Sequence, residues 1–335
     1  MKSRFFIFLI FISFFAYADV PREQIETELS QAEKDFQIAK KMFNPWYGGP
    51  LLTGSGNVLP PGYVNINPVL QITDNFAAYN ASRHAKSIPD FISINPSIAF
   101  GVGIVNRLDT TLSLQGYYQS QSDEKSGNIG DTSLKFGLAI LKEEPYVPAL
   151  KVSVKEIFPT GKYKNLKPEK ANVEGTGGGS YKTELGLGMS KVVWWWITHP
   201  MQFRLSLNYG FPAKVGVKNF NSYGGGFNTR GHVSPGNYFT GSFGYEFSFT
   251  QKFAFAVDLA YEYHNKTTFS GFNGTSIDGD IASIGGPSND FLSLAPAFEY
   301  NFTPDIALII GAWFSVWGRN SLDFGAGLIN FSYGF

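Results

Sequence analysis

The sequence predicts an all-β fold: a closed antiparallel transmembrane β-barrel of 12 strands, within a range of 10–14, that follows one N-terminal amphipathic helix. Three observations lead to this prediction. Apolar residues alternate with small or polar residues over most of the 335-residue chain, an export signal precedes them, and the last strand ends on an aromatic residue. The longest nearly apolar stretch after the N-terminus, residues 306–317, is too short for the ~20 residues of a membrane-spanning helix.

The N-terminus has the pattern of a cleaved secretory signal. A charged start and the apolar stretch 5–15 precede Ala16 and Ala18, which have the spacing of an A-x-A cleavage site. An apolar run of this length is too short for an anchor that spans a membrane. The sequence therefore predicts a signal peptide at residues 1–18 and an exported mature protein.

Residues 19–44 differ from the rest of the chain because their apolar residues recur at spacings of three and four. This is the period of one amphipathic helix, and the apolar positions are Ile25, Leu29, Ala32, Phe36, Ala39 and Phe43. The stripe is too short to favour a coiled coil over packing against the remaining protein. A Gly/Pro-rich linker, residues 45–61, separates this helix from the barrel domain, residues 62–335.

The barrel domain contains twelve segments with a period of two, which is the pattern of strands that are wetted on one side. The segments are 62–73, 91–105, 110–120, 131–141, 148–158, 180–191, 201–211, 237–249, 253–264, 290–302, 305–317 and 323–335. Their connections mostly alternate between short and long, as in a transmembrane barrel, although 318–322 is short where a long loop is due. A soluble β-sandwich does not account for Phe and Tyr at nearly every outward position. A bilayer offers no water to edge-strand N–H and C=O groups, so a sheet can span it only if closed.

The last strand carries its large apolar residues on a single face up to the end of the chain. Ile329, Phe331, Tyr333 and Phe335 alternate with small or polar residues. This pattern looks like the terminal assembly signal of bacterial outer-membrane barrels, through which the barrel-assembly machinery would act. The sequence thus predicts the outer membrane as the location, its lipids as partners, and both chain termini on the periplasmic side.

Two segments resemble a known family beyond this general architecture. Residues 130–138 start a strand with Gly-Asp, and residues 148–161 end a strand with Pro-Thr-Gly. They resemble the outer-membrane transporter family named after the meta-pathway of phenol degradation, with general similarity from about residue 50 to the end. The resemblance implies a barrel that passes small compounds, often hydrophobic or aromatic, and that is related in concept to fatty-acid channels.

The polar face of the strands would line the lumen. The candidate lumen-lining residues comprise a mainly basic group, a later acidic group and two tryptophans: Lys135, Lys151, Lys155, Lys182, Glu184, Arg204, Glu246, Asp258, Glu262, Glu299, Trp313 and Trp317. Two arrangements stay open: walls of opposite charge that face each other across an aqueous pore, or charges that pair and seal a narrow lumen. We favour a partly occupied lumen, because twelve strands enclose a modest interior, with residues 19–44 as a candidate plug.

Composition and motifs give little support to catalysis or cofactor binding. The chain has no Cys, which excludes disulfides and thiolate chemistry, and its four His lack ligand spacing, so no metal and no cofactor are predicted. The 27 basic residues balance the 27 acidic residues, which gives no reason to expect nucleic acid. His232 and Ser234 have the spacing of a catalytic pair, but they lie in a Gly-rich segment without a third residue to orient the imidazole.

The sequence therefore predicts an outer-membrane channel for a small-molecule solute, and not an enzyme. Two alternatives stay open. One is a structural or surface-exposed barrel without transport, and the other is an outer-membrane lipid hydrolase that uses His232 and Ser234.

Overall fold

The computed structural model describes residues 21–42, 45–195 and 199–335. The chain divides into two compact units, Met1–Met42 and Phe43–Phe335, and each is described by itself. Among the described residues, no helix combines the length and the apolarity needed to cross a membrane. The predicted cleavage residues Ala16 and Ala18 lie outside the described part of the chain.

The first unit contains one helix, α1, which spans Arg22–Met42. The N–H group of Ile25 donates to the carbonyl oxygen of Pro21, 3.2 Å away, so the helix begins directly after this proline. An ion pair of 2.7 Å joins Arg22 to Glu26 one turn later, and such exposed pairs add a few tenths of a kcal/mol, about 0.2–0.5. The predicted amphipathic helix is therefore present.

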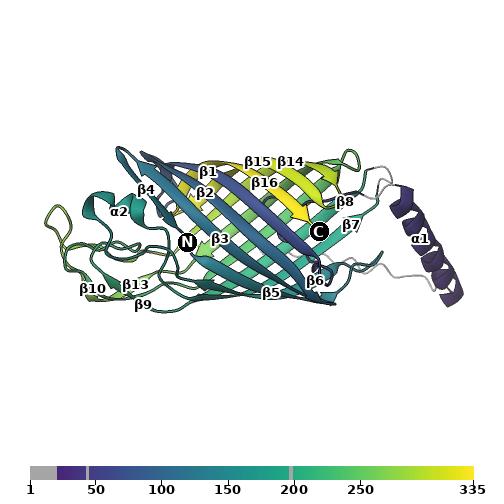
Figure 1. Cartoon of the computed structure of the whole chain (residues 1–335), viewed down its shortest axis with the longest axis horizontal. Coiled ribbons are helices and arrows are strands. Elements are labelled where there is room, and N and C mark those ends of the chain that lie inside the picture. Colours follow the sequence, from purple (N-terminus) through teal and green to yellow (C-terminus); the bar gives the residue numbers. More distant parts are fainter. Residues whose placement is uncertain (1–20, 43–44, 196–198) are drawn as a thin grey trace, which may run out of the picture. The chain divides into compact units, whose positions relative to one another are not determined.

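The second unit is a closed antiparallel barrel (Figure 1). Twelve of the described strands form the ring: β1 Val64–Tyr79, β2 Ala85–Val105, β3 Leu108–Gln121, β5 Thr132–Leu141, β6 Ala149–Phe158, β7 Lys182–Val193, β8 Met201–Pro212, β11 Tyr238–Ser248, β12 Phe253–His264, β14 Asn289–Thr303, β15 Ile306–Arg319 and β16 Leu322–Gly334. The first and last strands close the ring, since β1 pairs with β16 from Asn65 opposite Gly334 to Ala78 opposite Leu322. The prediction of a 12-stranded barrel is confirmed.

The two ends of the barrel differ in their connections. At the end where β1 starts and β16 finishes, called the terminal end below, the strands are joined by short turns such as 106–107 and 304–305. At the opposite end, called the loop end, three connections are long, residues 159–181, 213–237 and 265–288. This asymmetry agrees with the predicted alternation of short and long connections.

The long connections contain secondary structure of their own. They add a 3-10 helix Pro168–Lys170, α2 Ala171–Glu174, and a separate sheet of β9 Val215–Lys218, β10 Arg230–Ser234 and β13 Thr268–Phe272, while β4 Glu124–Ile129 extends the barrel wall beside β3. Val215, Val217 and Val233 form the buried core under this small sheet. The segment around His232 is therefore a strand, whereas the sequence pattern indicated a loop, because its alternation is too short to be recognised.

The two segments that carry the family resemblance meet at the loop end of β5 and β6. The carboxylate of Asp131 accepts hydrogen bonds of 3.0 Å from the backbone N–H groups of Gly161 and Gly178. The Thr160 hydroxyl donates to the carbonyl oxygen of Gly130 at 2.7 Å. These residues therefore connect the start of β5, the end of β6 and the long connection that follows β6.

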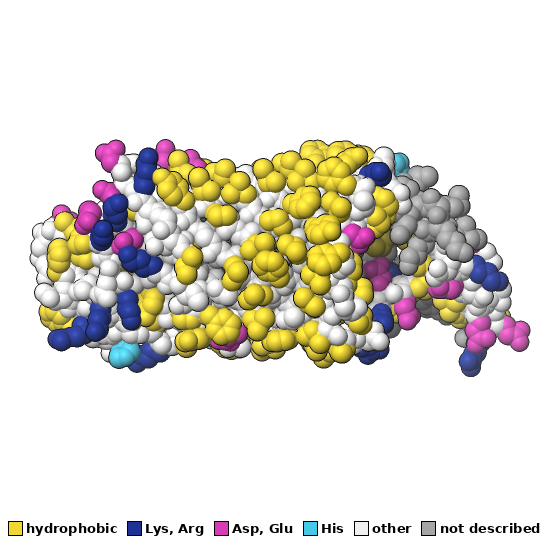
Figure 2. Space-filling model, viewed as in Figure 1, with side chains coloured by type: hydrophobic (Ala, Val, Ile, Leu, Met, Phe, Trp, Pro, Cys, Tyr) yellow, Lys and Arg dark blue, Asp and Glu magenta, His cyan; other side chains and the backbone are white. Residues whose placement is uncertain are grey.

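The outer face of the barrel is apolar. Figure 2 shows hydrophobic side chains spread along the wall, with few charged side chains between the ends of the barrel. Alternate residues of each strand face outward and stay exposed, as Leu259 and its cross-strand partner Phe243 do at 44% each, whereas Asp258, which precedes Leu259 on β12, is fully buried. Such a face suits contact with lipid, and the alternation is the one that the sequence predicted.

Predicted and observed strands differ most in β1 and β2. Both strands are longer than predicted and continue to a tight turn at residues 80–84, whereas the predicted segments end at residue 73 and begin again at residue 91. A β-bulge between Asn75 and Ala77 shifts the alternation there, which obscures the period of two.

Candidate functional site

The barrel lumen is occupied by residues 45–62, called the lumen segment below. This segment has no helix or strand and continues directly into β1. On one side of the lumen, two wall carboxylates bind its backbone. Glu299 of β14 accepts hydrogen bonds from the N–H groups of Gly48 and Gly49, and Asp258 of β12 accepts bonds of 3.0 Å from those of Leu52 and Thr53.

The other side of the lumen holds the segment by different groups. The Ser190 hydroxyl of β7 accepts a bond of 3.2 Å from the Gly56 N–H, and the Lys151 ammonium of β6 donates to the Asn57 carbonyl oxygen at 2.7 Å. Asp109 of β3 accepts a longer bond, 3.3 Å, from the Leu59 N–H. The lumen segment thus crosses the interior from β14 to β3 and satisfies its backbone groups on wall side chains.

Small residues of the wall make room for this segment. A Cβ atom placed on Gly103 of β2 would overlap the Pro60 carbonyl oxygen, and one placed on Gly244 of β11 would lie 3.1 Å from the Thr53 Cβ. Gly56 in the segment itself is equally close to the wall, since a Cβ there would lie 2.7 Å from the Ser190 nitrogen. Glycine is required at Gly103 and Gly56 because backbone approaches backbone there, whereas Gly244 approaches side chains of the segment.

The basic residues of the middle strands are paired with acidic residues rather than facing them across open water. Arg204 and Glu246 are almost fully buried and their charged atoms approach to 2.7 Å. Lys155 lies 2.6 Å from Glu184, and Lys151 lies 3.7 Å from Asp109. The sequence left two charge arrangements open, and these three contacts agree with the one in which opposite charges pair.

Three other predicted lumen residues lie on the inner face but make no hydrogen bond to the lumen segment. Glu262 lies 3.5 Å from His264 near the loop end. Lys182 lies beside the long connection after β6, where a Cβ on Gly178 would be 3.4 Å from its Nζ. Lys135 faces Thr111 across the β3–β5 pairing and makes no hydrogen bond or ion pair with any described residue.

The two predicted tryptophans lie on different faces. Trp313 points inward and its ring packs on Phe324, with centroids 4.8 Å apart. Trp317 does not line the lumen, because a β-bulge between Ser315 and Trp317 shifts the alternation and sets Trp317 opposite Leu292 on the outer face. The guanidinium of Arg83 lies 3.6 Å from its ring centroid.

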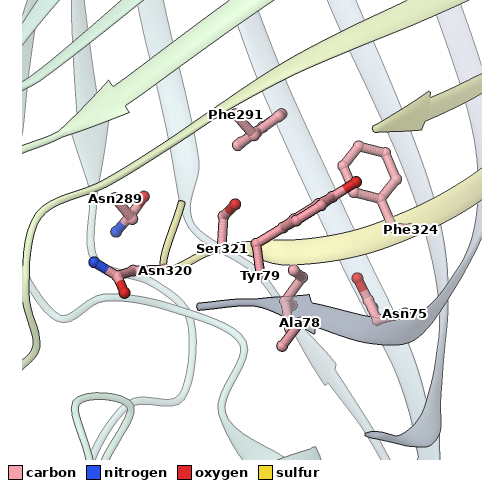
Figure 3. Close-up of a pocket in the computed structure, with 9 residues that line it drawn as sticks. Asn75, Ala78, Tyr79, Asn289, Phe291, Asn320, Ser321 and Phe324 are labelled. Carbon is pink, nitrogen blue, oxygen red and sulfur yellow. The ribbon is translucent and has the colours of Figure 1, made fainter. Parts of the chain in front are cut away.

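A cavity of about 550 Å³ lies at the loop end of the lumen. Its lining residues are Asn75, Ala78, Tyr79, Asn289, Phe291, Asn320, Ser321, Leu322 and Phe324. Figure 3 shows the amides of Asn289 and Asn320 beside each other on one side and the rings of Tyr79, Phe291 and Phe324 around the other. The cavity therefore offers aromatic surface together with a few hydrogen-bonding groups.

A second cavity, of about 540 Å³, lies between the lumen segment and the wall nearer the terminal end. Backbone and side chains of the lumen segment form much of its lining, and Lys135, Thr111 and Asn67 contribute from the wall. Its lining is more polar than that of the loop-end cavity, because it includes charged groups such as Lys135, Lys151 and Arg204.

The predicted assembly residues lie on the outer face of β16. Ile329, Phe331, Tyr333 and Phe335 are 46%, 37%, 40% and 61% exposed, respectively. Their role in assembly stays a prediction, as does the proposal that residues 19–44 plug the pore.

His232 and Ser234 lie on the exposed face of β10 in the loop-end sheet. Within the described residues, no carboxylate hydrogen-bonds to either side chain, and no group of three or more His, Asp or Glu could hold a metal ion. The arrangement provides no orienting residue for a hydrolase of the Ser-His-acid type.

Sequence analysis missed several residues that hold the lumen segment. Asp109 falls outside the predicted strand 110–120, because β3 starts two residues earlier than predicted. Asn301, which donates to the Trp46 carbonyl oxygen at 2.7 Å, carries no charge and so was not selected. Phe291 and Phe324 lie in the predicted strands 290–302 and 323–335, but the alternation alone does not mark them as lining a cavity.

No family model matches the chain, and neither does any curated protein. The fold is similar to that of a solved bacterial channel. This is the COG4313 outer membrane channel from Pseudomonas putida F1, which matches with a TM-score of 0.65 and 14% identity over 85% of this chain and 100% of that one. The beta domain of the Bordetella autotransporter BrkA matches with a TM-score of 0.46 and 10% identity, over 82% of this chain and 100% of that one. At these identities the likeness to the channel shows a shared fold, and the second match carries no argument.

Proposed function

We propose that this protein is an outer-membrane channel for small molecules, with hydrophobic or aromatic compounds as its substrates. One observation carries the proposal: the interior of the ring holds residues 45–62 and two cavities instead of a packed core of wall side chains. Barrels without a transport role can fill a small interior with side chains alone. Cavities of 540 and 550 Å³ fall within the range typical of small-molecule sites, roughly 300–1,000 Å³.

The substrate class is supported by the chemistry of the loop-end cavity. Phe291, Phe324 and Tyr79 provide aromatic surface, and Asn289 and Asn320 provide hydrogen-bonding groups. The resemblance to the family named after the meta-pathway of phenol degradation points the same way. The inferred route passes from this cavity towards the terminal end, where the lumen segment limits the flux.

The location in the outer membrane is supported by the apolar outer face and by the closed ring. A signal peptide at residues 1–18 would export the chain, and the C-terminal strand with Phe335 would engage the barrel-assembly machinery. The short turns of the terminal end then face the periplasm. The lipid hydrolase is the weaker alternative, because His232 and Ser234 lie on an exposed sheet and lack an orienting carboxylate within the described residues.

Planar-bilayer recordings of the refolded full chain test the proposal. We expect a small conductance for the unaltered protein and a severalfold larger one for the double variant Asp258→Asn and Glu299→Gln, which loses two anionic acceptors of the lumen segment. Glu262→Gln is the matched control, since it removes a lumen carboxylate that does not contact the segment. If neither the unaltered protein nor the double variant passes ions or small aromatic solutes, the barrel is a structural one and the proposal fails.

A further inference from the structure

Three lysines and two acids lie together on the inner faces of β3, β5, β6 and β7. Glu184 is fully engaged: one oxygen is 2.6 Å from the Lys155 ammonium, and the other accepts a 3.0 Å bond from the Tyr238 hydroxyl. The Lys151 ammonium lies 3.7 Å from Asp109 and also donates to the lumen segment. Each acid is thus associated with another lysine, and Lys135 is the surplus cation.

Lys135 faces the cavity between the lumen segment and the wall. It lies directly opposite Lys155 on β6 and Thr111 on β3, so one neighbour is a like charge and the other a hydroxyl. Its ammonium has no hydrogen bond or ion pair among the described residues. Lys135 is half-buried, and an ammonium beside a like charge and without a counter-ion is stabilised when an anion binds next to it.

The cavity around Lys135 has room and chemistry for an organic anion. Its volume of about 540 Å³ exceeds the needs of a single inorganic ion. Thr111, Asn65 and Asn67 can donate hydrogen bonds to a second carboxylate oxygen, while Leu59 and Ala99 offer apolar surface.

We propose that this cavity is a binding site for a small monocarboxylate, whose carboxylate pairs with the Lys135 ammonium while its apolar body contacts Leu59 and Ala99. The inference rests on the proposed channel function and names a substrate class for it: weakly hydrophobic acids such as aromatic carboxylates. An amide of the same shape would lack the charge that Lys135 requires.

The test measures equilibrium binding to the refolded full chain in detergent by titration calorimetry. Sodium benzoate is the anionic ligand and benzamide is its neutral counterpart. We expect benzoate to bind roughly tenfold or more tightly than benzamide, and Lys135→Met to remove that difference. Lys182→Met is the matched control, because it deletes the same charge from the inner face outside this cavity and should leave benzoate binding unchanged.

Three results would overturn the site. Equal binding of benzoate and benzamide to the unaltered protein would show that charge is not recognised. Unchanged benzoate binding by Lys135→Met would show that Lys135 does not hold the carboxylate. Full displacement of benzoate by chloride at equal concentration would indicate a site for inorganic anions. This measurement needs no bilayer, so it tests the site separately from the channel. Benzoate binding without flux would refute the channel function and support the site. Flux without benzoate binding would support the channel function and refute the site.

Discussion

The two halves of the lumen are built from different chemistry. Nearer the terminal end, wall residues form buried ion pairs, as Arg204 does with Glu246, and wall carboxylates bind a segment of the same chain, as Asp258 does at Thr53. At the loop end, aromatic rings surround a cavity that no chain segment fills, and Phe324 packs between Trp313 and Phe291. The difference teaches that one interior can combine a polar half that holds a chain segment with a half lined by aromatic rings. On the proposed route, a solute that enters at the loop end would meet the aromatic surface before the charged one.

The largest effect on stability is expected in the polar half. Arg204→Met leaves Glu246 buried without its cation, and breaking a buried pair in this way costs about 3–5 kcal/mol. Unfolding by guanidinium chloride in lipid vesicles measures the loss. The double variant Arg204→Met with Glu246→Leu should recover most of the stability, because neither charge remains. A single variant as stable as the unaltered protein would show that Glu246 has other means of compensation.

Truncation in the aromatic half should cost somewhat less. Phe324→Ala removes a 7% exposed ring that contacts Trp313 and Phe291, and such truncations typically cost about 3 kcal/mol. The same variant should lower the flux of aromatic solutes relative to that of small ions in planar bilayers. Phe331→Ala on the outer face is the control, and an equal loss of selectivity there would place the aromatic preference outside the lumen.

Overpacking at the contact between the wall and the lumen segment should have an intermediate effect. Gly103→Val places side-chain atoms where the Pro60 carbonyl oxygen lies, so the segment must shift, at a cost of about 1–3 kcal/mol. Conductance should rise as well. Gly327→Val is matched to it, because nothing lies within 4 Å of a Cβ at that position. If both variants behave alike, Gly103 is not a contact that restricts the pore.

The smallest effect is expected in the long connections of the loop end, outside the membrane, where α2 contains Glu174. Burial raises the pKa of Glu174, but its bonds to the Lys162 ammonium and the Lys167 N–H outweigh burial, so the net pKa is lowered. A lowered pKa contributes stability that is present above the ordinary value for Glu and is lost as the pH falls through the folded value. Glu174→Gln should therefore cost about 1 kcal/mol at neutral pH and progressively less in acid. The protease sensitivity of the connection 159–181 is compared between Glu174→Gln and the unaltered protein at several pH values. A difference between the two proteins that does not change with pH would contradict this prediction.

The sequence predicts the barrel well because its evidence is local and repeated. Alternation in segments such as 253–264 follows directly from one lipid-facing and one inward-facing side, and the observed β12 has the same bounds. Wall residues such as Arg204 and Glu299 could be assigned to the inner face from the same alternation. Their partners could not be predicted, because pairs such as Gly48 and Glu299 are brought together by the closure of the ring and not by spacing along the chain.

The position of residues 45–62 inside the lumen could not be predicted for a related reason. Many Gly and Pro residues are typical of a linker, and nothing in such a segment indicates that its backbone groups are bound by Glu299, Asp258 and Ser190. Trp317 was misplaced by a single bulge, which shifts every later residue of a strand to the opposite face.

The most direct test of the account is to fix the lumen segment to the wall by a reversible covalent bond. The chain has no cysteine of its own, and a Cβ on Gly244 would lie 3.1 Å from the Thr53 Cβ, so a separation by a few tenths of an ångström brings the pair into the ~3.5–4.5 Å range of a disulfide. The full chain with Thr53→Cys and Gly244→Cys is recorded in planar bilayers before and after reduction. The account predicts a low conductance when the bond is formed and a severalfold rise when it is reduced. Equal conductance in the two states would contradict the claim that residues 45–62 restrict the pore.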